Sequence, residues 1–265
     1  MGDYGPAALP LHSTRTGNPL QPAQAPQRSV GADNGPFKSN LVNASYLIAS
    51  SLPSSFTFPS PKDDPSVRRI SLHVHPSPIP VAYATVRQAL PVILEEFAAS
   101  HGGRRPDLVI HIGISPRPYY SVETLAHRDD YHITDVQGRS GYEDGEKLWK
   151  EMGLPPVLTP GCATTQVPSG SAAPYPPNDH FADTWRAFAP ATSDLRVSKD
   201  AGHYLCDFIF YTSMSLAMLN GQDRNVLFFH IPGASQDADI ERGRAIILAL
   251  IKTMVTCWID EKQAA

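Results

Sequence analysis

The feature that most constrains the fold is an alternation of short apolar runs with longer stretches in which apolar residues recur at helical spacing. The apolar runs have the length of buried strands and lie at 70–75, 108–112, 195–198 and 226–231. The amphipathic stretches lie at 86–97, 205–219 and 247–258. Strands that alternate with helices build a sheet covered by helices on both faces. We therefore expect a single-domain α/β fold, a three-layer α/β/α sandwich around a twisted, largely parallel sheet.

The two proline-rich parts of the chain do not follow this pattern. Residues 1–34 mix Pro, Gly, Gln and Ser without an apolar period, so we expect a disordered or atypical amino-terminal extension. The folded domain is expected to span 35–265 and to begin with a short helix that Pro53 closes. The segment around 155–192 is rich in Pro, Ser and Ala and predicts a mobile surface insertion.

Charge and composition exclude several classes of function. The net charge is −4 and no run is rich in Lys or Arg, so neither nucleic acid nor a membrane surface is an expected partner. The apolar stretch Ile246–Ile251 is far shorter than the ~20 residues of a membrane-spanning helix, and the first residues do not resemble a secretory signal. The three cysteines, Cys162, Cys206 and Cys257, are too scattered for a disulfide framework or a zinc pair. We expect a cytoplasmic protein with reduced thiols and no obligate protein partner.

Three residues at the ends of the expected helices and strands have side chains that suit nucleophilic catalysis. Cys206 lies in the first turn of an expected helix, where free N–H groups favour a thiolate. A helix terminus contributes only about 0.3 to 1 kcal/mol, so a thiol with a pKa near ~8.5 still needs a base. His230 ends an apolar strand and is the candidate base, while Glu123 follows the strand that reaches Gly113 and could orient His230.

From spacing alone this interpretation has competitors. A Cys, a His and a Glu co-occur by chance in a chain of this size, and a Cys near a helix start is more often simply buried. His203 lies closer to Cys206 in sequence, one helical turn before it, but we expect it to have no partner carboxylate that would orient it as a base. His73 and His75 share one face of a strand and could bind a metal, although no third ligand is recognisable.

The segment around Cys206 resembles a known family. Ser198 to Tyr211 reads S-x-x-A-G-x-x-x-C-D-x-x-x-Y, which is similar to the nucleophile segment of the pyroglutamyl peptidase I family. Phe228 to Pro232 resembles the family's strand ending in H-V/I-P, and Ile112 to Glu123 its segment that carries the glutamate. The resemblance covers most of residues 35–260. It implies a triad of Cys206 as nucleophile, His230 as base and Glu123 as the group that orients His230.

The same resemblance implies an activity. It suggests a cysteine-type omega-peptidase that hydrolyses the amino-terminal pyroglutamyl residue from peptides through a thiol acyl-enzyme, with no cofactor and no metal. The expected partners are amino-terminally pyroglutamylated peptides. Phe37, Ile114 and His132 are the residues that it suggests for substrate binding, with His132 where the family carries Arg or Lys as a helper for the oxyanion.

The sequence departs from the family at its start. The family has an apolar strand that leads into G-F-G-P-F, whereas here Asp33 to Phe37 reads D-N-G-P-F and 25–32 is no apolar strand. Asn34 therefore replaces one of two phenylalanines that enclose the lactam, and a core strand is expected to be missing. An alternative hypothesis follows, a catalytically impaired family member with a defective lactam pocket that acts as a non-enzymatic binding protein.

Overall fold

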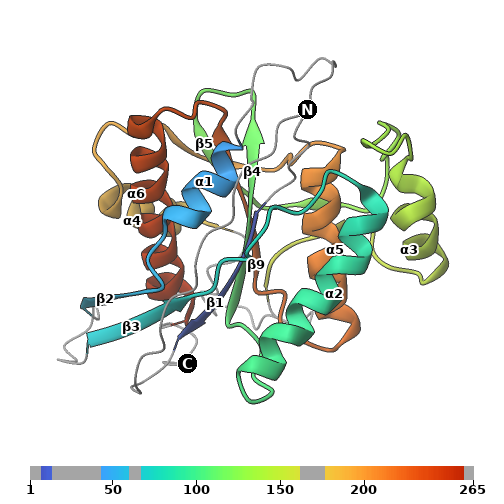
Figure 1. Cartoon of the computed structure of the whole chain (residues 1–265), viewed down its shortest axis with the longest axis horizontal. Coiled ribbons are helices and arrows are strands. Elements are labelled where there is room, and N and C mark those ends of the chain that lie inside the picture. Colours follow the sequence, from blue (N-terminus) through green and yellow to red (C-terminus); the bar gives the residue numbers. More distant parts are fainter. Residues whose placement is uncertain (1–6, 14–42, 60–66, 162–176, 260–265) are drawn as a thin grey trace.

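A seven-stranded sheet forms the centre of the computed structural model, which describes residues 7–13, 43–59, 67–161 and 177–259 (Figure 1). The strands follow the order β2-β3-β1-β4-β9-β5-β8, and β6 and β7 form a separate pair. The strands are β1 (Ala7–Ser13), β2 (Ser55–Pro59), β3 (Val67–Leu72), β4 (Leu108–Ser115), β5 (Tyr120–Glu123), β6 (Ala126–His127), β7 (Val157–Leu158), β8 (Leu195–Ser198) and β9 (Val226–Pro232).

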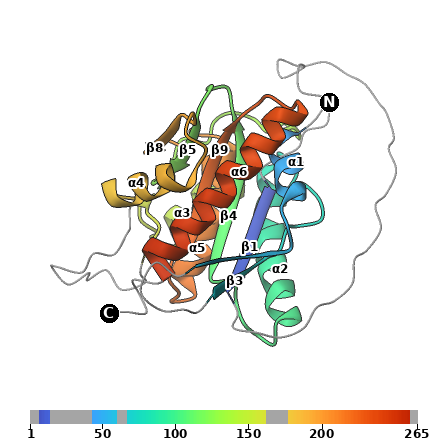
Figure 2. The same ribbon diagram turned by 90° about the vertical axis from the view of Figure 1, so that its left-hand side faces the viewer.

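Helices cover both faces of the sheet. They are α1 (Ala44–Ser51), α2 (Tyr83–Ser100), α3 (Lys147–Glu151), α4 (Asp179–Phe188), α5 (Leu205–Leu219) and α6 (Asp237–Met254), with π-helical turns η1 (Tyr142–Glu146) and η2 (Val255–Ile259). In Figures 1 and 2, α1, α4 and α6 lie on one face and α2 and α5 on the other. The expected α/β fold with a sheet between two helical layers is confirmed.

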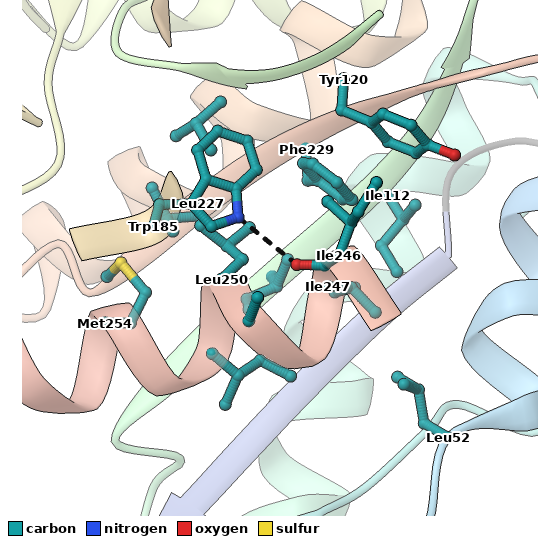
Figure 3. Close-up of a cluster of buried hydrophobic side chains, with 14 of the residues drawn as sticks. Leu52, Ile112, Tyr120, Trp185, Leu227, Phe229, Ile246, Ile247, Leu250 and Met254 are labelled. Carbon is teal, nitrogen blue, oxygen red and sulfur yellow. Dashed lines mark hydrogen bonds between the residues drawn. The ribbon is translucent and has the colours of Figure 1, made fainter. Parts of the chain in front are cut away.

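Each helical layer encloses its own apolar core. On the α6 side, Trp185 of α4 packs against Phe229 of β9 and its Nε1 donates to the carbonyl oxygen of Ile246 at 3.4 Å (Figure 3). On the α5 side, Phe208 packs against Tyr83 of α2, and Phe210 packs against Phe228 of β9. Successive residues of β9 therefore serve opposite cores, as expected for a strand covered on both faces.

The strand directions are more mixed than the largely parallel arrangement that the sequence pattern favoured. Among the described strands of the main sheet, β4 pairs with β9 and β5 with β8 in parallel, while the other four pairings are antiparallel. The link between β4 and β5, residues 116–119, is too short for the crossover that a parallel pair requires, so the chain turns back.

Two expectations about the proline-rich parts need correction. We expected residues 1–34 to leave the sheet without an amino-terminal strand, yet β1 (Ala7–Ser13) lies between β3 and β4. We also expected a mobile insertion around 155–192, yet this segment contains β7 and the packed helix α4, whose Phe181 and Trp185 are buried. Two large side chains four residues apart form the apolar stripe that anchors α4. The rest of 1–34 and residues 162–176 lie outside the described ranges.

A helix that crosses a membrane must be both long and apolar. Within the described residues, no helix combines both properties to the degree that crossing a bilayer needs.

Candidate active site

Cys206 is the second residue of α5, at a helix start that has no side-chain cap. The N-cap residue, Tyr204, contributes only its main-chain carbonyl, which accepts from the N–H of Phe208 at 2.9 Å. Gly202 makes the turn into the helix with a φ of 82°, a conformation that glycine adopts without strain. Among the described residues no side chain caps the first N–H groups of α5, so these groups can face a negative charge close to the Cys206 thiol.

His230 and Glu123 meet across two neighbouring strands. His230 lies on β9 directly opposite Ser121 of β5, and Glu123 follows two residues later on the same face of β5. The Nδ1 atom of His230 lies 2.8 Å from Oε1 of Glu123. Glu123 is 0% exposed and His230 is 7% exposed, so water screens this contact little.

The other side of the His230 ring faces Cys206. Burial by itself lowers the pKa of His230. Cys206 and Glu123 act in the opposite direction, each through a hydrogen bond and through its charge. Their combined effect is larger than that of burial, and it raises the pKa of His230 to about 9. Because Nδ1 is engaged by Glu123, Nε2 is the ring atom left for Cys206. The three side chains form a row in which a proton can move between Cys206 and His230 while Glu123 holds the ring.

Gly113 provides the space for the Cys206 thiol. It lies opposite His230 in the parallel pairing of β4 with β9. A Cβ atom added at Gly113 would be 2.9 Å from Sγ of Cys206 and 2.6 Å from Cζ of Phe228. Only a residue without a side chain allows the thiol to lie this close to the strand.

The residues predicted for catalysis come together, but from other elements than expected. We expected the triad to come from three loops, with Glu123 in the loop after Gly113. Instead β4 continues to Ser115, Glu123 is the last residue of strand β5, and His230 lies within β9. A four-residue strand with tyrosine at its start and a carboxylate at its end carries too little alternation to be recognised from sequence.

The residues predicted for substrate binding have separate outcomes. Phe37 lies outside the described residues. The side chain of Ile114 packs against the α6-side core, on the face of β4 opposite to Gly113, so its main-chain atoms alone could reach a substrate beside Cys206. The side chain of His132 is 76% exposed and its Nε2 lies 3.5 Å from Oδ1 of Asp130. Its role at the oxyanion stays a prediction.

Sequence reasoning missed a polar cluster that surrounds Asp207, the residue after Cys206. Asp207 is fully buried, and its carboxylate accepts from the main-chain N–H of His127 at 3.2 Å and from the hydroxyl of Tyr131 at 3.0 Å. Nδ1 of His127 also lies 3.2 Å from Oδ2 of Asp207, and this hydrogen bond is the main cause of a raised pKa of His127. Burial is the main cause of a raised pKa of Asp207. An acidic residue in the first turn of a helix was the available signal.

Two of the three histidines that the sequence left open, His203 and His73, lie in other surroundings. His203 is exposed, with Nδ1 3.3 Å from the carbonyl oxygen of Asp129 and its ring 4.9 Å from that of His127. His73 packs its ring against Phe97 and His101. The candidate metal-binding cluster among the described residues is instead His127, His203 and Asp207, whose ligand atoms lie within 4.8 Å of one another.

Comparison with known proteins relates the whole arrangement to one family. No family model matches the chain. Pyroglutamyl-peptidase 1 of Rattus norvegicus is 27% identical over 229 residues, which cover 83% of this chain and 86% of that protein. This similarity supports the resemblance to the pyroglutamyl peptidase I family. Pyroglutamyl-peptidase 1 of Homo sapiens matches with the same identity and coverage.

A solved structure supports the fold. The crystal structure of Pf-PCP is 19% identical and covers 86% of this chain and 94% of its own length, with a TM-score of 0.57. The segment that resembles the pyroglutamyl peptidase I family around Cys206 forms the turn into α5 and its first turns. The motif therefore lies on the element that carries Cys206.

Proposed function

We propose that the protein is a cysteine peptidase that removes the amino-terminal pyroglutamyl residue from peptides. The observation that carries the proposal is the row of Glu123, His230 and Cys206, with 2.8 Å between the carboxylate and Nδ1 and a hydrogen bond between the ring and the thiol. The names of the relatives, pyroglutamyl peptidases, support the substrate class. A metal or cofactor is not needed for this chemistry.

The row of side chains accounts for both halves of an acyl transfer. The Cys206 thiol gives its proton to His230, and the thiolate attacks the pyroglutamyl carbonyl carbon. The free N–H groups at the start of α5 are placed to hold the oxyanion that forms. His230 then protonates the leaving amine, and the C–N bond breaks to leave a thioester on Cys206.

Water completes the cycle. His230, now neutral, takes a proton from a water molecule whose oxygen attacks the thioester, and the C–S bond breaks to return the thiol. Glu123 keeps the ring in the tautomer with Nδ1 protonated and stabilises the imidazolium without giving up its own charge. Replacement of Glu123 should therefore reduce turnover less than replacement of Cys206 or His230.

The substrate adds a requirement of its own. Pyroglutamate is a neutral lactam without an α-ammonium group, so its pocket should be largely apolar with a few hydrogen-bonding groups. Phe37, the main chain at Ile114 and His132 remain our candidates for these contacts. Asn34 in place of the family's first phenylalanine favours the alternative function, a binding protein with an impaired pocket.

The test is release of a fluorescent amine from a pyroglutamyl amide by purified protein whose folding is checked by circular dichroism. Turnover should disappear in Cys206→Ala and His230→Ala, whereas Glu123→Gln should keep a measurable fraction. Cys257→Ala is the matched control, because Cys257 is a buried cysteine on η2, in the core on the other face of the sheet.

Either result decides between the two functions. Full turnover by Cys206→Ala would refute the mechanism. A folded wild-type protein without turnover that binds pyroglutamyl peptides in calorimetry would establish the binding protein instead.

A further inference from the structure

Ser121 lies inside the catalytic face without being part of the triad. It is 1% exposed and lies directly opposite His230 in the pairing of β5 with β9. Its Oγ donates to Oε1 of Glu123 at 2.9 Å. That oxygen is also the one that faces Nδ1 of His230 at 2.8 Å. Ser121 and His230 thus hold the same carboxylate oxygen from two sides.

The surroundings of Glu123 make this contact important. The other carboxylate oxygen, Oε2, has no hydrogen-bond partner among the residues that the structure describes. A buried carboxylate depends on its few donors both for its charge and for its orientation. Of the described donors to Glu123, Ser121 is the one that does not take part in proton transfer. It can therefore fix the carboxylate through every protonation state of His230.

We propose that Ser121 is a positioning residue that acts through Glu123 to keep the His230 ring directed at Cys206. This inference rests on the proposed function, and it names a further residue for the same reaction. The titratable groups that face His230 are Cys206 from α5 and Glu123 from β5, while β4 contributes Gly113 opposite it. Loss of the hydroxyl would free the carboxylate to rotate and would weaken the pairing of thiolate with imidazolium.

The first test compares Ser121→Ala with Ser121→Thr, which keeps the hydroxyl. We expect kcat for the pyroglutamyl amide to fall about tenfold in Ser121→Ala, with KM changed by less than about twofold because the Ser121 hydroxyl is buried and donates to Glu123. The acid limb of the pH profile should move to higher pH by about 0.5 unit. Ser121→Thr should keep most of the wild-type kcat and most of the wild-type pH profile.

A matched control separates this effect from the loss of any buried serine. Ser215 is also buried on the α5 side, and its Oγ donates to the carbonyl oxygen of Thr212 at 2.9 Å, nine residues along α5 from Cys206. Ser215→Ala should lose stability as Ser121→Ala does and keep the wild-type kcat and pH profile. An equal fall of kcat in both variants would overturn the proposal.

A second readout does not depend on any peptide substrate. The rate at which iodoacetamide alkylates Cys206 reports the thiolate fraction, and its pH profile should shift upward in Ser121→Ala. If wild-type protein does not cleave the amide, the proposed function fails while this profile still tests Ser121. An alkylation profile identical to that of the wild type would overturn the positioning role.

A different observation carries a second inference, which concerns the cluster of His127, His203 and Asp207. One ligand atom from each residue lies within 4.8 Å of the others. Asp207 is buried at the base, His127 is half-buried, and His203 is exposed at the top. Two imidazoles and one carboxylate are a donor set that suits Zn²⁺, and the exposed side leaves a position for water.

Hydrogen bonds to two of these residues, Asp207 and His203, resemble an outer shell. The Asp207 carboxylate is held by the Tyr131 hydroxyl, and Nδ1 of His203 faces the carbonyl oxygen of Asp129 at 3.3 Å, which leaves Nε2 for a ligand. Groups that bind metals are commonly oriented in this way. We propose that the cluster binds Zn²⁺, which would displace the proton between His127 and Asp207 and join the β6 segment to the start of α5. Occupancy next to Cys206 should slow turnover.

The test is calorimetric titration of ZnCl₂ into Cys206→Ala protein, a background in which the thiolate cannot be the ligand. We expect one site, with affinity reduced at least about tenfold in His203→Ala. His180→Ala, an exposed histidine on α4, is the control and should bind as its parent does. No binding, or equal binding with and without His203, would overturn this proposal.

Discussion

Replacing Gly113 by alanine should disable the site with little loss of the fold. The added Cβ would lie 2.6 Å from Cζ of Phe228 and 2.9 Å from Sγ of Cys206, closer than unstrained carbon contacts allow. Phe228 is fully buried, and its ring contacts those of Phe210 and His230, so it has little room to move. Cys206 is only partly buried, so the thiol should yield and leave its position beside His230.

The magnitude follows from overpacking. A methyl group forced into a filled core costs about 1 to 3 kcal/mol, which for a domain of this size lowers Tm by about 3 to 10 °C. The same shift separates Sγ from His230, so we expect kcat/KM to fall by at least about a hundredfold, because misplacing the reacting groups by about 1 Å has this effect. The assay is pyroglutamyl amide turnover beside a thermal melt.

Gly243 offers the matched control. A Cβ there would lie 2.2 Å from Cδ1 of Ile48, a severe clash on the α6 side of the sheet. Gly243→Ala should therefore alter stability and keep activity. Wild-type turnover by Gly113→Ala, or an equal loss in both variants, would refute the reasoning.

Three further predictions concern stability. The pKa of His230 is raised from 6.5 to about 9, so the contribution of its charged ring to the free energy of unfolding is complete below about pH 6.5 and is lost as the pH rises to about 9. Urea unfolding across this range should show the decrease in the free energy of unfolding, and this decrease should be smaller in His230→Ala. Burial lowers the pKa of His111 to about 3, so stability should decline as pH falls below about 6.5, and His111→Leu should weaken that decline in the same assay. Trp185→Ala should cost about 3 to 5 kcal/mol, and a urea midpoint unchanged from the wild type would contradict the role we assign to α4.

His111 also illustrates what the tertiary structure adds to a strand that was correctly predicted. The run at 108–112 is a buried strand, as its apolar residues indicated. Within it, His111 is fully buried and both ring nitrogens lack a hydrogen-bond partner among the described residues. Such an unpaired group costs about 1 to 3 kcal/mol, a cost that strand periodicity does not reveal.

The sequence by itself determined the fold class, the helix that carries Cys206 and the identity of the three catalytic candidates. Apolar periodicity and a specific motif are local properties, so they can be read along the chain. Helix α5 begins and ends where the pattern indicated, and β9 differs by one residue.

Only the tertiary structure decided how these residues meet. The antiparallel register of β5 with β9 places Ser121 opposite His230 and brings Glu123 to its ring, and the parallel register of β4 with β9 places Gly113 against Cys206. Register depends on pairing between segments about a hundred residues apart, and a shift of one residue would turn each side chain to the other face of the sheet. That long-range pairing positions the site, and no local pattern in the sequence encodes it.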